Sequence, residues 1–263
     1  MKTRLLLLTL ALPMLCSAQS YQAKDDTAFP AAKHNFHYVG DDKPLKDTDF
    51  AGTDLAGRPV SVPPPSQQPP SLVATPHPIE VAESERAYSD GRLADAIAAV
   101  AEVAKLEPAD PTVLYCYARA LYRDNDTREQ SYPVYHRLIA LLDMYGRENA
   151  YTVTVYLPFL EAYFKLATLQ LDAQQWEAAS YNLSRAAAAL QTMPNAAAQN
   201  ALLREQILQY QTECFANLHN SKLCRYFGQR TLHFFPKNRY VKQYLAALPK
   251  PKRQQQRSPT KSR

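Results

Sequence analysis

Glycine is scarce in this sequence, and no two glycines lie close together. Six occur among the 263 residues, at positions 40, 52, 57, 91, 146 and 228. A loop that cradles a phosphate, or a dinucleotide-binding turn, needs clustered glycines because its backbone must approach the anion closely. The sequence therefore excludes the glycine-rich classes of nucleotide-binding protein.

Signatures of nucleophilic catalysis are absent as well. There is no G-x-S-x-G turn, and no cysteine lies within a known catalytic motif. His136, His219 and His233 fall in segments with helical periodicity, where we expect packed or solvated side chains. We therefore expect a protein without enzymatic activity, cofactor or metal. An unrecognised active site is the open alternative, and it would require an activity that is lost on changing a polar surface residue.

The sequence also lacks an apolar run long enough to span a bilayer as a helix, which takes about 20 residues. A shorter run over residues 5–15 follows two basic residues and precedes small ones, a pattern typical of a secretory signal peptide. We predict that residues 1–18 are removed, that the mature chain begins at Gln19, and that the protein is exported, either periplasmic or secreted. Lipid attachment at Cys16 is the alternative, which the absence of a small residue just before Cys16 disfavours.

Beyond Cys16, cysteine occurs only as Cys116, Cys214 and Cys224. Exported proteins meet an oxidising environment in which disulfides form, but three is an odd number. Cys214 and Cys224 lie on neighbouring predicted helices, at positions that face different directions. We therefore expect three buried thiols, with a disulfide between Cys214 and Cys224 as the alternative.

Proline, in contrast, is concentrated between the signal peptide and the first predicted helix. Residues 59–78 contain eight prolines, which favour an extended, solvated chain. We predict that residues 19–78 form a disordered leader and linker. His34 and His37, followed by two aspartates, are of the type that binds metals, but we expect no metal site because no rigid frame is predicted around them.

Helical periodicity begins near residue 80 and continues to about residue 248. Residues 80–110 are predicted to form two amphipathic helices, separated at Asp90-Gly91 and ended by Pro108. The apolar stripe of the second helix consists of Leu93, Ala96, Ile97, Val100 and Ala104. A helix pair this short cannot bury that stripe alone, so it needs similar neighbours.

An antiparallel helix pair of about 34 residues that ends in proline resembles the tetratricopeptide repeat (TPR). Further copies are marked by Leu114, Tyr117, Ala118 and Leu121, by Tyr163, Leu166, Ala167, Trp176, Ala179, Leu183 and Ala186, and by Leu208, Phe215 and Pro236. In the last copy, Cys224 and Gly228 replace the expected alanine and aromatic residue. The resemblance implies an all-α, TPR-like helical-hairpin solenoid over residues 79–249. It would contain about four irregular repeats and a capping helix at residues 238–248.

Two segments fit this repeat frame poorly. Residues 152–156 alternate β-branched side chains and could form a strand, but their position between helix pairs favours the start of a helix. Pro133 is compatible with a helix that begins at Tyr132 and has Ser131 as its N-cap, because first-turn N–H groups lack intrahelical partners.

In the tetratricopeptide family, the first helix of each repeat faces a concave groove that binds protein or peptide partners. The resemblance assigns to that groove Tyr88, Tyr115, Arg119, Tyr122, Arg123 and Phe164. Aromatic side chains are enriched where binding energy concentrates, and arginine binds carboxylates bidentately. This composition suits an acidic or C-terminal peptide, although it lacks the two-carboxylate clamp of heat-shock co-chaperones. We expect an exported interaction scaffold. The alternative is an ordinary helix surface whose tyrosines pack between repeats.

The end of the chain is strongly basic. Residues 250–263 contain six basic residues and no acidic one, which predicts a disordered tail. The basic residues are Lys250, Lys252, Arg253, Arg257, Lys261 and Arg263. An alternative function is binding of this tail to an anionic surface of the cell envelope. Salt would weaken such binding, since screening acts over about 10 Å at 0.1 M. Nucleic acid is not an expected partner of an exported chain.

Overall fold

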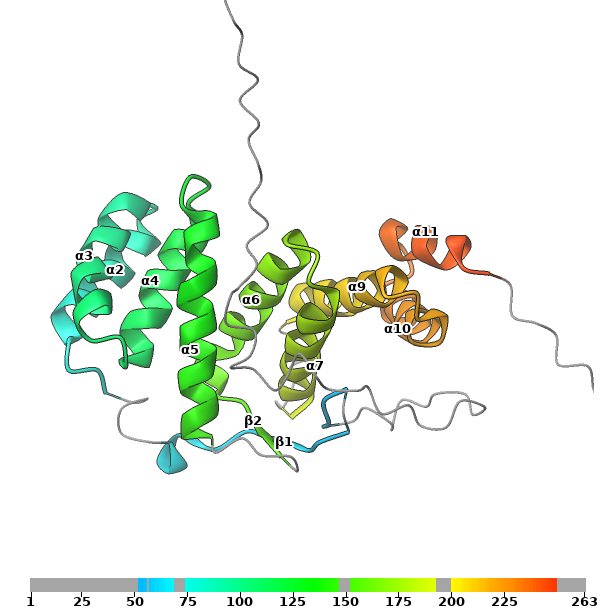
Figure 1. Ribbon diagram of the computed structural model, residues 1–263, viewed down its shortest axis with the longest axis horizontal. Coiled ribbons are helices and arrows are strands. Elements are labelled where there is room, and N and C mark those ends of the chain that lie inside the picture. Colours follow the sequence, from blue (N-terminus) through cyan, green and yellow to red (C-terminus); the bar gives the residue numbers. More distant parts are fainter. Residues whose placement is uncertain (1–51, 56, 69–73, 147–151, 193–199, 250–263) are drawn as a thin grey trace, which may run out of the picture.

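The computed structural model of the protein describes residues 52–55, 57–68, 74–146, 152–192 and 200–249. These residues form an all-α fold in which neighbouring helices pack in a solenoid-like row (Figure 1). The helices are α2 (Pro78–Ser89), α3 (Leu93–Leu106), α4 (Pro111–Arg123), α5 (Ser131–Tyr145), α6 (Leu160–Asp172), α7 (Trp176–Thr192), α9 (Ala201–Asn217), α10 (Ser221–Phe234) and α11 (Arg239–Ala247). Short 3-10 turns are η4 (Pro65–Gln67), η5 (Arg128–Gln130) and η6 (Leu157–Phe159), and two strands are β1 (Val60–Ser61) and β2 (Val153–Thr154).

The first helix pair, α2 and α3, forms where the sequence predicts it. Gly91 takes a φ of +78° between the two helices, a conformation that glycine adopts without steric cost. Ala96, Val100 and Ala104 of the predicted stripe are buried. Ser84 donates a hydrogen bond of 2.9 Å from α2 to the Ala96 carbonyl of α3, which ties the two helices together.

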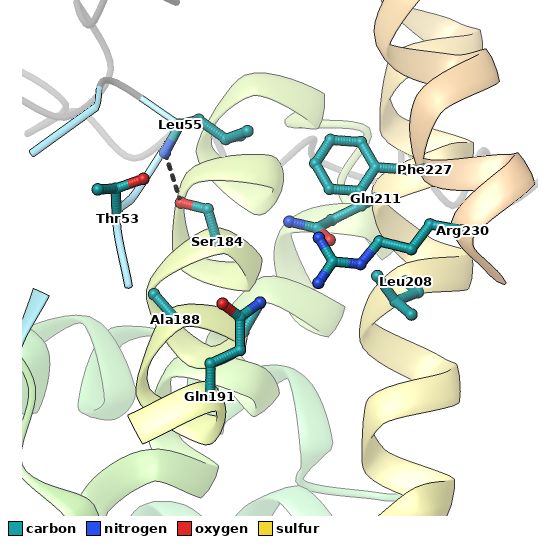
Figure 2. A pocket seen from close by; sticks show the side chains of 10 residues that line it. Thr53, Leu55, Ser184, Ala188, Gln191, Leu208, Gln211, Phe227 and Arg230 are labelled. Atoms are coloured by element: carbon teal, nitrogen blue, oxygen red, sulfur yellow. Dashed lines mark hydrogen bonds between the residues drawn. The ribbon is translucent and has the colours of Figure 1, made fainter. Parts of the chain in front are cut away.

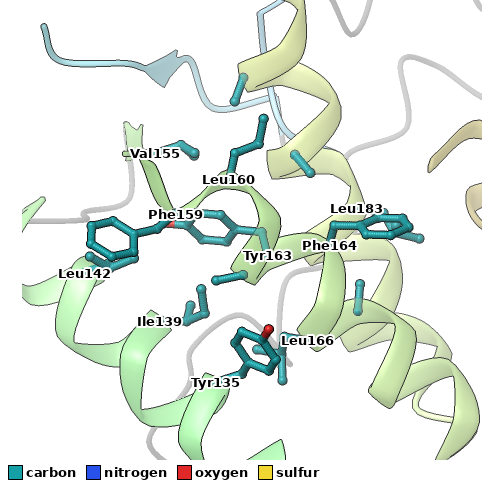
Figure 3. Packing of buried hydrophobic residues seen from close by; sticks show 14 of the residues in the cluster. Tyr135, Ile139, Leu142, Val155, Phe159, Leu160, Tyr163, Phe164, Leu166 and Leu183 are labelled. Carbon is teal, nitrogen blue, oxygen red and sulfur yellow. The ribbon is translucent and has the colours of Figure 1, made fainter. Parts of the chain in front are cut away.

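The main hydrophobic core lies among α5, α6 and α7 (Figure 3). Tyr135 and Leu142 of α5 face Tyr163 and Leu166 of α6, and Leu183 of α7 completes the cluster. All five side chains are almost fully buried. Because a solenoid stacks helix pairs on their neighbours, this central cluster joins the second pair to the third.

The last helix of the described residues is the capping helix that the sequence predicts, α11. Asn238 is its N-cap and accepts a hydrogen bond from the Val241 N–H at 3.0 Å. The Asn238 amide also donates to Glu205 at 2.9 Å and to Gln209 at 2.8 Å on α9. These bonds fix α11 against the last helix pair.

The presence of glycine at position 228 is explained by the close packing of α10 against α11. A Cβ atom on Gly228 would lie 2.7 Å from Cδ2 of Leu245, so α10 and α11 approach closely only because glycine has no side chain. The capping contact therefore explains why the fourth repeat departs from the expected aromatic residue.

The prediction of a helix start at residues 152–156 is wrong, because Val153 and Thr154 form strand β2. This strand pairs in parallel with β1, with Val60 opposite Val153 and Ser61 opposite Thr154. The Val153 and Val155 N–H groups donate to Pro59 and Ser61 carbonyls at 3.0 and 2.9 Å. The pairing partner lies about ninety residues earlier, so local periodicity could not reveal it.

Part of the predicted disordered leader is packed, and that prediction is wrong for the described residues between 52 and 61. We call these residues the N-terminal loop. Asp54, Leu55, Arg58 and Val60 are all buried. The loop buries two aliphatic residues, Leu55 and Val60, and one ion pair rather than a periodic stripe, so its sequence carries no signal of packing. Residues 1–51 lie outside the described part of the chain.

Helix α5 differs from the prediction by one residue, because it begins at Ser131 rather than at Tyr132. Ser131 is not the N-cap. Its hydroxyl donates to the Arg128 carbonyl of the preceding turn at 2.5 Å. Pro133 still lies in the first helical turn, where its missing N–H costs no intrahelical hydrogen bond.

Cys116, Cys214 and Cys224 are free and buried, as the sequence predicts, and Cys214 is not bonded to Cys224. Burial raises the pKa of the Cys116 thiol to about 12, and it also raises the pKa values of Cys214 and Cys224. Because the thiolate is the reactive form, we expect none of the three to react with Ellman's reagent at pH 8 in the folded protein. All three should react in denaturant, and a fast-reacting thiol in the native protein would contradict this burial.

Candidate functional site

The residues assigned to the groove lie on the first helices of three successive pairs. Tyr88 belongs to α2, Phe164 to α6, and the other four to α4. Together with three charged residues that contact them, they form what we call the tyrosine surface. Its members are Glu85, Tyr88, Tyr115, Arg119, Tyr122, Arg123, Glu161, Phe164 and Lys165.

Two arginines of α4 hold the ring of Tyr88. The Arg119 and Arg123 guanidinium carbons lie 4.2 and 4.8 Å from its centroid, within the range of cation–π attraction. Arg123 also donates to the Tyr88 carbonyl at 3.1 Å. The predicted surface is therefore brought together across the first and second helix pairs.

Arg119 is half-buried and forms an ion pair with Glu85 of α2. Burial alone would raise the pKa of the Glu85 carboxyl, but hydrogen bonds from Arg119 and Cys116 outweigh it and lower the pKa. Arg123, in contrast, is exposed, and its contacts described above are with Tyr88. Both arginines thus link α4 to α2, but Arg119 does so through a half-buried ion pair, whereas Arg123 contacts Tyr88 and is exposed to solvent.

Tyrosine side chains of α4 also contact polar and charged side chains of α6. The Tyr115 hydroxyl donates to Glu161 at 3.1 Å, and the Tyr122 hydroxyl lies 2.8 Å from the Thr168 hydroxyl. The Lys165 ammonium lies 4.4 Å from the Tyr122 centroid. Burial and the nearby charge of Arg128 lower the pKa of Lys165, against the opposing attraction of Glu161.

Phe164 is the predicted residue that contributes least exposed area. It is buried, and its ring stacks on Tyr210 of α9 with centroids 6.1 Å apart. The tyrosines also contact the next helix pair, as the alternative prediction of packing between repeats requires. Tyr88 and Tyr122 occupy equivalent positions, one repeat length apart. The surface therefore combines repeat packing with exposed polar groups.

Two hydrogen-bond donors of this surface lack a close acceptor. Arg119 Nε is buried and has no hydrogen-bond partner among the described residues. The Lys165 ammonium is 3.8 Å from Glu161, which is too long for a strong hydrogen bond. Buried polar groups normally find partners, so these donors favour a ligand that supplies acceptors.

Sequence reasoning missed several members of this surface. Glu85 and Glu161 occupy frame positions that the resemblance assigns to the groove, so the repeat frame carried their signal. Lys165 lies at another frame position. Its role depends on contacts between helix pairs, which no single-segment pattern shows.

A buried polar cluster, separate from the tyrosine surface, lies between α5, α6 and α7. Arg185 of α7 is fully buried, and it forms an ion pair with Asp143 of α5. Its guanidinium carbon lies 4.4 Å from the Tyr163 centroid and 5.5 Å from the Tyr181 centroid. Tyr181 in turn accepts a hydrogen bond from Arg58 of the N-terminal loop. This cluster connects α5, α6, α7 and the loop.

Comparison with known proteins identifies no relative. No protein-family model matches the chain, and neither the curated proteins nor the solved structures contain a similar one. Among the described residues, no group of three or more His, Cys, Asp or Glu side chains could hold a metal ion. Within the same residues, none of the helices has the length and apolar character of a membrane span. The signal peptide, the two leader histidines and the basic tail lie outside the described residues, and those predictions stay predictions.

Proposed function

We propose that the protein is an exported, non-enzymatic interaction scaffold of the tetratricopeptide type. It binds a protein or peptide partner on the tyrosine surface. The observation that carries the proposal is the continuous run of tyrosine rings and cationic side chains across α2, α4 and α6. Aromatic residues and arginine are the residue types that most often dominate binding energy at protein interfaces.

The partner segment carries carboxylates, either acidic side chains or a free C-terminus. Arg123 is exposed, and Arg119 Nε lacks a partner among the described residues. A carboxylate accepts two parallel hydrogen bonds from a guanidinium group, which gives both affinity and orientation. The carboxylates of Glu85 and Glu161 already accept hydrogen bonds from Arg119 and Tyr115. The missing acceptors therefore come from the partner.

The test begins with affinity capture of the partner by the mature protein and continues with Arg123→Glu. We expect this substitution to weaken binding at least tenfold, because it replaces an attraction for the partner's carboxylate by a repulsion. Arg123 is exposed and loses only its cation–π contact and hydrogen bond with Tyr88, so the free energy of unfolding should fall by no more than about 2 kcal/mol. The affinity is measured by isothermal titration calorimetry.

The matched control is Arg137→Glu, which makes the same charge change at an exposed position of α5, away from the tyrosine surface. It should leave the affinity unchanged. Arg119→Glu is a poor test, because it would place a second carboxylate against Glu85 and disturb folding. Equal affinities of the Arg123 and Arg137 variants would mean that the partner binds elsewhere.

A further inference from the structure

The N-terminal loop is a compact unit that holds its own shape. The Val60 N–H donates to the Gly52 carbonyl at 2.8 Å, and the Asp54 N–H donates to the Arg58 carbonyl at 3.0 Å. Asp54 and Arg58 also form an ion pair of 2.9 Å. Gly57 turns the chain with a φ of +76°. These bonds lie within the loop, so it keeps a defined shape in addition to its contacts with the solenoid.

The loop contacts the solenoid through two buried aliphatic side chains and several hydrogen bonds. Val60 belongs to the main hydrophobic core, and the Gly52 N–H donates to the Gln191 side chain of α7 at 3.3 Å. The Leu55 side chain enters a small hydrophobic cluster with Leu208 of α9 and Phe227 of α10 (Figure 2). The Leu55 N–H donates to the Ser184 hydroxyl of α7 at 3.4 Å. Arg58 reaches Tyr181, and β1 adds two residues of pairing with β2. Leu55 therefore makes the apolar contact with α9 and α10, and Val60 makes the apolar contact with the main core.

The helices that contact the loop leave a small cavity and two polar atoms that the loop does not bind. A cavity of about 20 Å³ remains between the loop and the helices α7, α9 and α10 (Figure 2). Gln211, which is 1% exposed, lines this cavity, and its carbonyl oxygen has no hydrogen-bond partner among the described residues. Arg230 Nε, on the same lining, also lacks one. The cavity thus presents one unused acceptor and one unused donor.

We propose that the face formed by β2, α7, α9 and α10 is a second protein-binding site, which the N-terminal loop occupies in cis. The partner is a loop of another protein with an aliphatic residue at its tip, like Leu55. It also carries a carboxamide or hydroxyl side chain that donates to Gln211 and accepts from Arg230. These two hydrogen bonds give the partner an advantage that the resident loop lacks, since buried unpaired polar groups destabilise a complex. The proposal is independent of the tyrosine surface.

Because the N-terminal loop occupies the proposed site, a partner must compete with it for binding. A tethered loop acts at an effective concentration in the millimolar range, so it masks the site from weak ligands. Weakening the docking of the loop should therefore unmask the site. Leu55→Asp does this, because a carboxylate is strongly disfavoured in the apolar cluster around Leu208 and Phe227.

The experiment uses the full chain and a labelled peptide of residues 52–61, cyclised to hold the loop shape. Fluorescence anisotropy should show that the Leu55→Asp chain binds this peptide at least tenfold more tightly than the unaltered chain does. The matched control peptide carries Leu55→Asp and should not bind either chain. Equal binding to both chains, or no binding to the Leu55→Asp chain, would overturn the proposal.

A second route covers the case in which Leu55→Asp disturbs folding. A protease site inserted between Gln68 and Ala74 allows the linker to be cut in the otherwise unaltered chain. The labelled peptide should then replace the resident loop while circular dichroism stays helical. Unfolding of the cut chain, or a loop that never exchanges, would make the loop a structural element and overturn the proposal. A dimer that forms at high concentration and is abolished by Leu55→Asp would make the occupant a second copy, which also contradicts it.

Discussion

Replacing Asp143 with alanine is expected to lower the free energy of unfolding by about 3 to 5 kcal/mol. Arg185 is fully buried, and Asp143 is its carboxylate partner. Removing that carboxylate leaves the guanidinium charge inside the solenoid with less compensation. Desolvation of an ion is costly, so the loss exceeds the net value of the pair itself.

Urea denaturation followed by circular dichroism measures this effect, and Asp126→Ala is the matched control. Asp126 is exposed, so its substitution should change stability by no more than about 0.5 kcal/mol. Replacing both partners, Asp143→Leu with Arg185→Met, should recover much of the loss, because apolar groups of similar size remove both charges at once. An Asp143→Ala chain as stable as Asp126→Ala would show that the Arg185 charge is solvated.

The helix pairs could be predicted because their signals are local. In the first pair, Ala96, Val100 and Ala104 follow the helical period, and Gly91 marks the turn between the helices. Each of these signals spans only a few residues, and burial of the stripe needs only another helix of the same kind. The assignment to the tetratricopeptide family is a further step, and it stays a prediction.

The buried polar cluster could not be predicted, because its partners come from distant segments. Arg185 lies on a helix rich in alanine, where a single arginine normally faces solvent. It is buried because Asp143 and Tyr163 reach it from α5 and α6. The N-terminal loop is a similar case, since Leu55 is buried by residues of α9 and α10. No pattern in the neighbouring sequence predicts either contact.

The tyrosine surface was predicted only in part from the sequence. The repeat frame predicted Tyr88, Arg119 and Arg123, and the structure brings the three together. It did not predict that Arg119 is paired with Glu85 while Arg123 is exposed. Residue type and frame position determine which face a side chain occupies. Its pairing depends on the neighbouring repeat, and this difference makes Arg123 the sharper test of binding.

Leu183→Ala is expected to destabilise the protein by about 2 to 5 kcal/mol. Leu183 is fully buried at the centre of the row, in the cluster that joins α6 and α7 (Figure 3). Alanine and leucine are both good helix formers, so the loss comes from the cavity and from apolar contacts rather than from the helix itself. For a domain of this size each kcal/mol lowers the melting temperature by about 2 to 4 °C.

Leu202→Ala makes the same chemical change on α9, where the side chain is 70% exposed. It should alter stability by less than about 0.5 kcal/mol. Calorimetric melting of the two variants compares them directly, and a single cooperative transition should persist in both. In a solenoid, stability is carried by contacts between neighbouring pairs, so a cavity beside α6 should lower the melting temperature of the whole row. Equal melting temperatures for the two variants would contradict the central position of Leu183 in the core.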